Sequence, residues 1–513
     1  MMSQTDKEIV RGAIILTYAG LLSKVLSAFY RIPLQNITGD VGFYIYQQIY
    51  PFIGMMTMLM LYGLPQSIAA LLIDQPSFKR KKKKMRYFLY SVALMLFICL
   101  FALAPTFSRW MGDHSLVTGL RVSFLLLFIL PELALERGFD QAEGRIDRTA
   151  ISQVLEQLFR VSVIIVGAVI IMRQQQSLYN VGIVAGLGAL VGGGVALSYF
   201  YIRNKKQAEQ TDLNNLSTAP FSYSILVKPL LLYSVMIAMN HMVLLLLQWV
   251  DAFTLVGLLK ESGSSLNDAQ ILKGVLDRAQ PLSQLGIVAS SSITLALVPG
   301  LTKATKRQDH KQMAQLAGTA YRFGLYLSSA AMVGLVLLMQ KVNLVLFKDT
   351  AGTISLQIFV ISVLFTSLAI ITSTILQAYG EGRRVVIGII TGLGVKYLTN
   401  HLLVPSFFLP GAAVSTVLAT VVIFYFNRLL LKKHVPQGLG APIVKLMIAL
   451  VGMAIVVFGM DVLLSPWFFS DQRMLQFIYL LSLITLGIIT FGTLLVKTGA
   501  ISKEEQSLLL KEK

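Results

Sequence analysis

Long apolar runs recur along the whole chain, and short polar segments separate them. Each run holds about 20 residues or more, which is enough to cross the ~30 Å hydrocarbon core of a bilayer as a helix. A transmembrane barrel would instead need ~10-residue segments of alternating polarity, and the sequence has no such series. The pattern predicts an all-α polytopic membrane protein with fourteen transmembrane helices. The predicted spans are 12–32, 43–73, 87–108, 118–136, 149–172, 178–202, 229–250, 280–301, 320–340, 353–379, 385–404, 411–430, 443–461 and 474–496.

Composition agrees with this class. The 513 residues are 55% hydrophobic and only 13% charged, whereas a soluble domain carries about 25% charged residues. The first run follows Asp6 and Glu8 and has no evident small-residue cleavage site, so we expect a retained first span and not a signal peptide. The single cysteine, Cys99, excludes a disulfide within one chain and argues against a cysteine-ligated metal site.

The net charge of +19 would suggest nucleic acid as the partner of a soluble chain. Here the basic residues follow the predicted topology instead, because 31 of the 44 lysines and arginines lie in one alternating set of connecting segments and the tails. Basic residues of short loops stay on the cytoplasmic side. We therefore expect no nucleic-acid partner, a plasma-membrane location and both termini in the cytoplasm.

Two segments of the chain resemble each other. They read QAEGRIDRTAISQVLEQLFRV from Gln141 and QAYGEGRRVVIGIITGLGVKYL from Gln377, and they align Arg160 with Lys396. Parallel repeats are typical of transporters, with the substrate bound at the repeat interface. The repeat predicts a six-helix lobe at 1–203, a cytoplasmic linker at 204–224, a second six-helix lobe at 225–435, and helices 13 and 14 with a cytoplasmic tail at 436–513.

Three cations, Lys24, Arg160 and Lys396, fall near the middle of predicted spans. A charge at that depth costs about 2.5–3.5 kcal/mol on insertion scales, so such residues face a cavity or a partner. Arg160 has two open interpretations, because Glu156 lies one turn earlier and could neutralise it. Lys24 and Lys396 have no acid within their own spans, which favours a cavity. The excess of cations over acids suits an anionic ligand, since Lys and Arg bind phosphate at short range.

Other polar residues near span ends leave alternatives open. Asp277, Arg278 and Gln280 open the eighth predicted span as either a capping cluster with a local ion pair or a substrate gate. Asn240 and His241 either hydrogen-bond a neighbouring helix or take part directly in ligand or proton binding. Asp251 closes the seventh span. We treat Glu156, Asp277, Asp251, Asn240 and His241 as candidates for gating or coupling.

Several motifs are absent from the sequence. It contains no G-x-x-x-x-G-K-[ST] loop, so no ATPase is built in, and no H-E-x-x-H motif or Cys/His cluster that suggests a metal enzyme. We expect no catalytic residue, metal or cofactor. The chain is predicted to be a secondary-type transporter and not an enzyme, coupled to the membrane potential or to a monovalent cation.

Four motifs resemble one transporter family. The motifs are SKVLSAFYRIPL (23–34), GDVGFYIYQQIYP (39–51), TAISQVLEQLFRV (149–161) and DRAQPLSQLG (277–286). With these motifs, the chain resembles the polysaccharide-transporter branch of the multidrug/oligosaccharidyl-lipid/polysaccharide exporter superfamily, which includes the stage V sporulation protein B group and the Gram-positive lipid II flippases. The resemblance implies two six-helix lobes in a V around a central cavity, with two further helices beside a groove for a lipid tail.

The resemblance also implies a function. Members move a lipid-linked sugar for cell-envelope synthesis across the membrane by alternating access. It implies contacts between the substrate headgroup and Lys24, Arg278 and Arg31, where Lys24 replaces the usual arginine. Adding Arg160, Lys396 and Gln280 gives the predicted substrate-binding set for an undecaprenyl-pyrophosphate-linked sugar, either lipid II or another precursor. The expected partners are this anionic glycan lipid, membrane lipids and cell-envelope synthesis enzymes.

Two other functions remain open from the sequence. A cation-coupled multidrug exporter of the same superfamily would need essential buried acids in an apolar and aromatic cavity, and the cation excess argues against it. A non-transporting scaffold of an envelope synthesis complex would leave the aligned Arg160 and Lys396 unexplained.

Overall fold

The computed structural model describes residues 19–74, 82–208, 228–435, 439–468 and 472–501. Within these ranges the chain is helical and has no β-strand. Each predicted span falls on helix, although residues 12–18 of the first span and most of the predicted linker at 204–224 lie outside the described residues. Helices satisfy their own backbone hydrogen bonds, which is what a chain without access to water requires.

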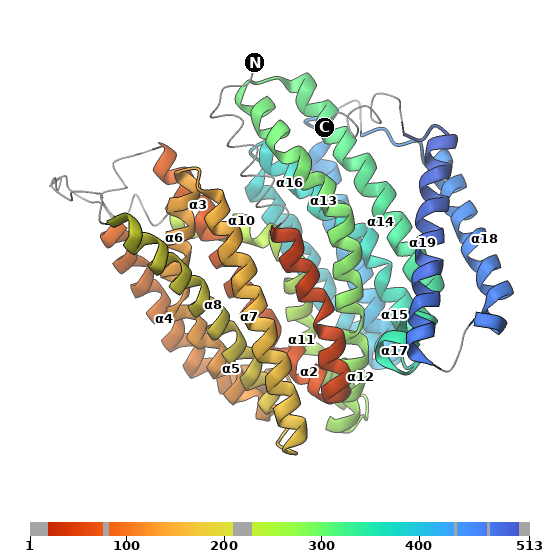
Figure 1. The fold of residues 1–513 in the computed structure, drawn as a ribbon, viewed down its shortest axis with the longest axis horizontal. Helices are drawn as coiled ribbons and strands as arrows, with labels where there is room; N and C mark the ends of the chain where they lie inside the picture. The colour runs from red at the N-terminus through yellow and green to blue at the C-terminus, as the bar shows by residue number, and fades with distance from the viewer. Residues whose placement is uncertain (1–18, 75–81, 209–227, 436–438, 469–471, 502–513) are drawn as a thin grey trace. The chain divides into compact units, whose positions relative to one another are not determined.

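The chain divides into two compact units, and the first comprises residues 1–277 and 382–412. Helical residues 19–29 lead into α2 in this unit. Its elements are α2 (Arg31–Met58), the π-helical η1 (Leu59–Gly63), α3 (Leu64–Asp74), α4 (Lys82–Trp110), the 3-10 turn η3 (His114–Leu116), α5 (Val117–Phe124), the 3-10 turn η4 (Leu125–Phe128), α6 (Leu130–Ala142), α7 (Ile146–Arg173), α8 (Asn180–Ala208), the π-helical η5 (Lys228–Tyr233), α10 (Ser234–His241), α11 (Val243–Glu261), α12 (Leu266–Asp277) and the first part of α17 (Gly382–Leu431). Figure 1 shows α4, α5, α7 and α8 running side by side in this unit.

The second unit comprises residues 278–381 and 413–513. Its elements are α13 (Ala279–Lys306), α14 (His310–Phe347), α15 (Thr353–Val360), α16 (Ser362–Ala378), the end of α17, α18 (Ile443–Phe468) and α19 (Arg473–Lys497). These units do not follow the predicted lobe boundaries, because the chain changes unit after Asp277 and again within α17. The two predicted six-helix lobes stay a prediction.

Ten helices of the described chain are long and apolar enough to span a membrane, or eleven with the bent pair His114–Phe128 and Leu130–Ala142. Two of the ten are too long for one crossing. The 55-residue stretch Ala19–Ile73 would extend about 80 Å if straight, and it breaks at Gly39 (φ 68°). The 50-residue α17 breaks at Phe408, between Pro405 and Pro410. Each long segment therefore contains two predicted spans joined at a break, and the count of fourteen crossings stays a prediction.

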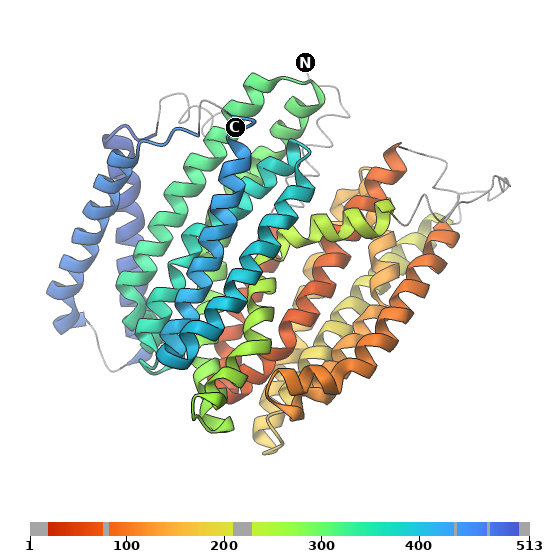
Figure 2. The same ribbon diagram turned by 180° about the vertical axis from the view of Figure 1, so that it is seen from behind.

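The seventh predicted span, 229–250, is broken within the apolar region. α10 ends at His241 and α11 begins at Val243, and the backbone of Met242 between them is not helical (φ −114°, ψ 18°). Figure 2 shows the yellow-green segment η5 and α10 lying crosswise to the green α11. The break places Asn240 and His241 at the junction of two helices. A continuous apolar pattern contains no signal for such a break.

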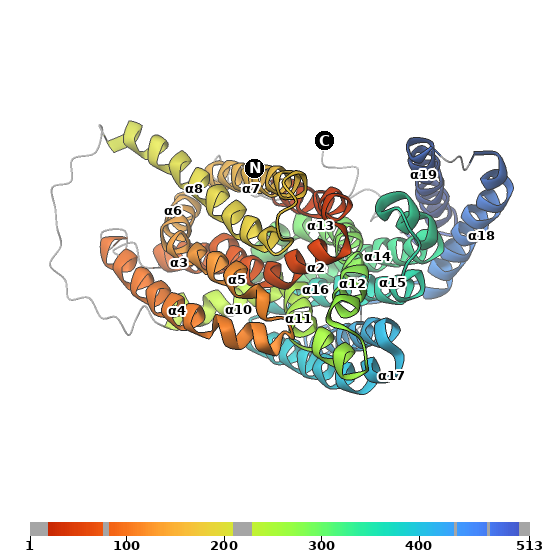
Figure 3. The same ribbon diagram turned by 90° about the horizontal axis from the view of Figure 1, so that it is seen from below.

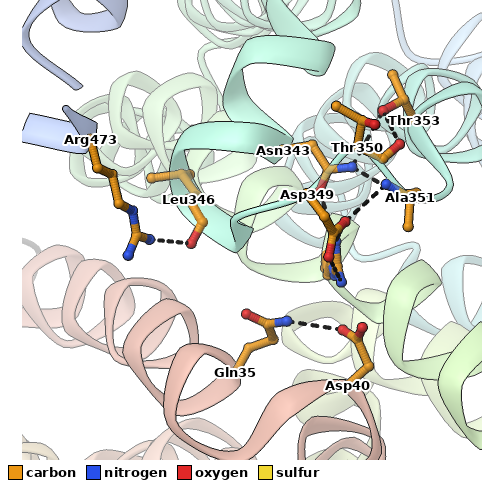
Figure 4. A network of polar contacts seen from close by, with 10 residues as sticks. Gln35, Asp40, Asn343, Leu346, Asp349, Thr350, Ala351, Thr353 and Arg473 are labelled. Carbon is orange, nitrogen blue, oxygen red and sulfur yellow. Dashed lines mark hydrogen bonds and ion pairs between the residues drawn. The ribbon is translucent and has the colours of Figure 1, made fainter. Parts of the chain in front are cut away.

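Helices α18 and α19 pack against each other and against α14 in the second unit. Figure 3 shows the two side by side. Lys341 of α14 contacts Asp461 of α18 at 2.7 Å (Nζ to Oδ2), and Arg473 at the start of α19 donates to the Leu346 carbonyl at 2.8 Å (Figure 4). Polar contacts near the ends of the helices thus anchor two spans whose exposed faces are otherwise apolar.

Candidate functional site

A buried carboxylate shared by two arginines lies in the first unit. Glu156 of α7 accepts from Arg137 of α6 at 2.8 Å (Oε2 to Nη2) and also forms an ion pair with Arg160, one turn later on α7. Arg137 also donates to Ser152 Oγ at 3.1 Å, and Arg160 to Thr57 Oγ1 at 3.2 Å. All three charged side chains are buried. The group carries two positive charges and one negative charge.

Glycines of α8 allow this arrangement. A Cβ atom at Gly192 would collide with the Glu156 carbonyl oxygen, and one at Gly188 would lie 3.0 Å from the Arg160 carbonyl oxygen. The bare glycine backbone therefore lets α8 pack closely on the part of α7 that bears the two charges. Close packing excludes lipid from this side of α7, so the arginines face the interior of the unit.

Arg31, at the first position of α2, is enclosed by tyrosines. Its guanidinium carbon lies 4.1 Å from the centre of the Tyr50 ring, and Tyr30 hydrogen-bonds it. The Tyr46 ring packs edge-on against Tyr30, with centroids 6.0 Å apart, and their hydroxyls are hydrogen-bonded. Arg31 is buried, yet its Nε and Nη1 have no hydrogen-bond partner among the described residues. Buried donors of this kind are costly unless a ligand accepts from them.

A second ion pair lies on α12. Lys273 contacts both carboxylate oxygens of Asp277 at 2.6 Å, one turn apart, and both side chains are buried. A Cβ atom at Gly274 would collide with the Asp40 carbonyl oxygen, so a glycine is needed for α12 to lie against α2. Asp277 also interacts electrostatically with Arg31. The close approach of α12 thus brings a mixed charge pair to the tyrosine-enclosed arginine.

A third ion pair joins α11 to the first part of α17. Lys396 Nζ lies 2.8 Å from Asp251 Oδ1, and the two side chains are 0% and 4% exposed. Asn400, one turn after Lys396, donates to Asp251 Oδ1 at 3.0 Å and to Thr254 Oγ1 at 2.9 Å. The sequence offered Lys396 no acid within its own span. Its partner comes from another helix, which only the tertiary structure supplies.

These groups interact in series. Arg160 interacts electrostatically with Tyr30 and Tyr50, Asp277 interacts with Asp251, and Lys396 interacts with Lys273 and Asp277. We call the series the buried charge chain. Its cations are Arg31, Arg137, Arg160, Lys273 and Lys396, and its acids are Glu156, Asp251 and Asp277. All are buried, and the chain has two more positive than negative charges.

Lys24 lies near one end of this series, and its side chain is partly exposed. It interacts electrostatically with His241, whose ring stacks on Tyr62 with centroids 4.2 Å apart. Tyr62 in turn hydrogen-bonds Gln153 and interacts with Arg137. Asn240, beside His241, is buried on α10. The structure thus brings Lys24 and His241, which are far apart in the sequence, into one polar region.

Arg278 and Gln280 lie in the second unit, and both are buried. Arg278 forms a bidentate pair with Asp349, with Nη1–Oδ1 at 2.5 Å and Nη2–Oδ2 at 2.9 Å. It also donates to Asn343 Oδ1 at 3.1 Å. Figure 4 shows Asp349 and Asn343 within one hydrogen-bonded network. The guanidinium is therefore held by side chains of α14 and the loop that follows it.

Two members of the buried charge chain, Arg137 and Lys273, are not among the site residues that the sequence predicts. The hydropathy pattern assigns both to connecting segments, yet both are buried and ion-paired. The Lys273–Asp277 pair was detectable, because the two residues are four apart on a helix. Arg137 offered no such signal, since Glu156 lies on the next helix. Within the described residues, no group of three or more His, Cys, Asp or Glu side chains could hold a metal ion.

Comparisons with known proteins identify similar chains. The family model described as "Polysaccharide biosynthesis protein" matches residues 9–305. The chain is 38% identical to "Uncharacterized membrane protein YabM" of Bacillus subtilis (strain 168), over 79% of this chain and 76% of that protein. It is 23% identical to "Lipid II flippase MurJ" of the same organism, over 90% of this chain and 89% of that protein.

One solved structure has a similar fold over nearly the whole chain. It is "Lipid II flippase MurJ, inward closed conformation", with a TM-score of 0.68 and 14% sequence identity. The match covers 97% of this chain and 99% of that chain. The predicted all-α membrane fold and the resemblance to the polysaccharide-transporter branch are both confirmed.

Proposed function

Because the chain belongs to the polysaccharide biosynthesis protein family, we propose that it moves an undecaprenyl-pyrophosphate-linked sugar across the cytoplasmic membrane by alternating access. The protein is a multi-pass membrane transporter and not an enzyme. The proposed substrate is lipid II or another precursor of a cell-envelope polysaccharide. Similarity to a lipid II flippase over 90% of the chain supports this class of substrate.

The excess of positive charge in the buried charge chain is the observation that carries this proposal. A diesterified pyrophosphate loses its hydration on entering the protein, and fixed positive charge must compensate for that loss. Arginine donors match phosphate oxygens in geometry as well as in charge. Arg31, Arg137 and Arg160 each have a buried N–H without a partner among the described residues, which is the chemistry an anionic headgroup requires.

The three acids of the buried charge chain argue against the exporter alternative. A cation-coupled drug exporter needs a buried carboxylate that can exchange its cation. Glu156, Asp251 and Asp277 each form an ion pair with lysine or arginine at close range. Fixed cations of the protein therefore take the place that an exchangeable ion would need. The scaffold alternative predicts no loss of function when a cation of this region such as Lys24 is neutralised, so the rescue experiment with Lys24 variants given below also addresses it.

The proposal extends to the setting of the transporter. We propose that both termini face the cytoplasm, since the basic residues concentrate in the tails and alternate connecting segments. We also propose that the membrane potential, or a monovalent cation that binds away from these three paired acids, drives transport, and that envelope synthesis enzymes supply and consume the substrate.

Lys24 provides the test of this function. Cells depleted of their lipid II flippase are supplied with the wild-type protein, Lys24→Arg or Lys24→Gln at equal membrane level. Removing one charge-assisted contact should cost about 1.5–3 kcal/mol, or tenfold and more in affinity. We expect viability from the wild type and Lys24→Arg, and little or none from Lys24→Gln. Full rescue by Lys24→Gln would contradict the cationic site, and failure of the wild type would exclude lipid II as the substrate in those cells.

A further inference from the structure

Arg278 is a buried cation that forms an ion pair with the carboxylate of Asp349. The guanidinium is fully buried, and its planar edge pairs with both oxygens of Asp349. Asn343 contacts it at 3.1 Å, and the Phe347 ring centre lies 5.4 Å from its guanidinium carbon. The paired edge is the part of an arginine that recognises carboxylate and phosphate with similar geometry.

Asp349 is the accessible partner. Its side chain is 46% exposed, whereas that of Arg278 is 0% exposed. It lies in the short loop between α14 and α15, where Lys348 has a left-handed backbone (φ 72°), and its Oδ1 also accepts from the Ala351 N–H at 2.9 Å. The hydrogen bonds from Arg278 hold the pKa of Asp349 below its ordinary value, so the carboxylate is charged at neutral pH.

From this geometry we infer that Asp349 is a built-in competitor that keeps weakly binding anions, bulk anionic phospholipids above all, away from Arg278. The inference rests on the proposed function together with the contact between Arg278 and the substrate headgroup that the family resemblance implies. The carboxylate occupies the two donors that a phosphate would use. A ligand binds there only when it displaces Asp349, which sets a minimum affinity for occupancy.

A tethered competitor leaves strong and weak ligands with different occupancies of the site. It lowers the affinity of every anion for Arg278 by the same factor, because each must break the same ion pair. A phospholipid phosphate carries one negative charge and offers about what the carboxylate already provides. A pyrophosphate diester carries two charges and can reach other donors, so it retains enough affinity to displace the carboxylate. In a membrane rich in anionic lipid, little lipid then occupies the site, and the affinity for the substrate depends little on the lipid composition.

The test compares ligand binding to full-length protein in nanodiscs. Asp349→Asn removes the charge but keeps an oxygen that can accept from Ala351, and Asp349→Ser is a second variant that keeps a local acceptor. The probe is an undecaprenyl-pyrophosphoryl disaccharide, in phosphatidylcholine discs with and without phosphatidylglycerol. Asp461→Asn is the matched control, since it removes the acid of the Lys341–Asp461 pair in the same unit. Arg278→Gln reports binding without the guanidinium.

We expect Asp349→Asn to bind the probe about tenfold more tightly than the wild type in neutral discs, as the loss of a charge-assisted competitor predicts. Phosphatidylglycerol should then weaken binding to this variant and leave the wild type and Asp461→Asn unchanged. Adding Arg278→Gln to the wild type and to Asp349→Asn should abolish the difference between them. If Asp349→Asn and Asp349→Ser bind as weakly as Arg278→Gln, or show no sensitivity to phosphatidylglycerol, the inference is wrong.

The two measurements, binding of the probe and the effect of phosphatidylglycerol, separate this inference from the function on which it rests. Absence of probe binding to every variant, with phosphatidylglycerol bound only by Asp349→Asn in an Arg278-dependent way, would contradict the proposed substrate and support the competitor role. Probe binding by the wild type without any gain in Asp349→Asn would support the substrate class and refute the competitor role.

Discussion

The Lys396–Asp251 pair allows structural and functional roles of a buried charge to be separated by measurement. Breaking a buried ion pair by removing one partner costs about 3–5 kcal/mol, because the other charge is left without compensation. With a contact of 2.8 Å and side chains that are 0% and 4% exposed, we place this pair in that range. Replacing both partners by apolar residues is often nearly neutral.

The surroundings of the pair predict which single variant is worse. After Lys396→Met, Asp251 still accepts from Asn400 at 3.0 Å. After Asp251→Asn, Lys396 loses its closest acid, and Lys273 repels it more strongly than Asp277 attracts it. We therefore expect Asp251→Asn to lose more stability than Lys396→Met. The double variant Lys396→Met/Asp251→Leu should recover most of the loss, since Asn400 can still donate to Thr254 at 2.9 Å.

Two assays are needed. Unfolding by SDS in mixed micelles gives the free energy of unfolding of each variant, and the viability rescue described above reports its function. The double variant should fold and yet fail to restore growth if the charges take part in transport. A stability of Lys396→Met equal to that of the wild type would refute the assigned energy. A double variant as unstable as the two single losses combined would show that packing, and not uncompensated charge, is responsible.

Three further predictions test other parts of the site and the orientation. Burial raises the pKa of Asp277, at the end of α12, to about 6. As the pH falls through that value, Asp277 takes up a proton and loses its negative charge, so the net charge of the buried charge chain becomes more positive by one. Binding of an undecaprenyl-pyrophosphoryl disaccharide should then strengthen below about pH 6 in the wild type and stay flat across this range in Asp277→Asn. Glu156→Gln should sharply reduce the folded protein recovered from membranes, because two buried arginines lose their counter-ion, whereas Glu132→Gln, at a partly exposed pair, should change little. A cysteine at Ser264, with Cys99 replaced, should react with an impermeant thiol reagent in intact cells, and protection of that site would reverse the proposed orientation.

Local spacing indicated one of the ion pairs that the structure contains. Glu156 and Arg160 are four residues apart on one helix, and the structure pairs them as that spacing allows. The same spacing joins Lys273 to Asp277, but the count of loop charges had placed Lys273 outside the membrane core. Helix periodicity is sufficient for both pairs, but the hydropathy pattern assigns Lys273 to the polar segment between the predicted spans 229–250 and 280–301.

Contacts between distant helices could not be predicted. Asn400 and Asp251 are 149 residues apart in the sequence, and nothing near either residue indicates the other. The same limit applies to Arg278, whose partner Asp349 follows a different helix. Hydropathy identified the spans because every membrane helix needs an apolar length. Which polar faces meet depends on the tertiary packing of helices, which hydropathy does not record.

Of two helix breaks, one is marked in the sequence and the other is not. Pro405 and Pro410 lie on either side of the break at Phe408, so the sequence marks it, and the two predicted spans end and begin there. The break at Met242 has no proline or glycine next to it. It nevertheless places His241 where it stacks on Tyr62 and interacts with Lys24. A break without a sequence signal is thus the reason why the polar region around Lys24 emerged only from the structure.

Charge balance links the stability of the buried charge chain to its proposed substrate. Five cations and three acids leave an excess of two positive charges, and each acid lowers the cost of burying the cation beside it. A pyrophosphate joined to lipid on one side and sugar on the other carries two negative charges. Binding such a headgroup would neutralise the excess of the buried charge chain. This lowers the electrostatic cost of enclosing the headgroup and the charged side chains together in a low-dielectric interior. A monoanionic headgroup would leave one charge uncompensated, so the same residues that permit burial also favour a doubly charged ligand.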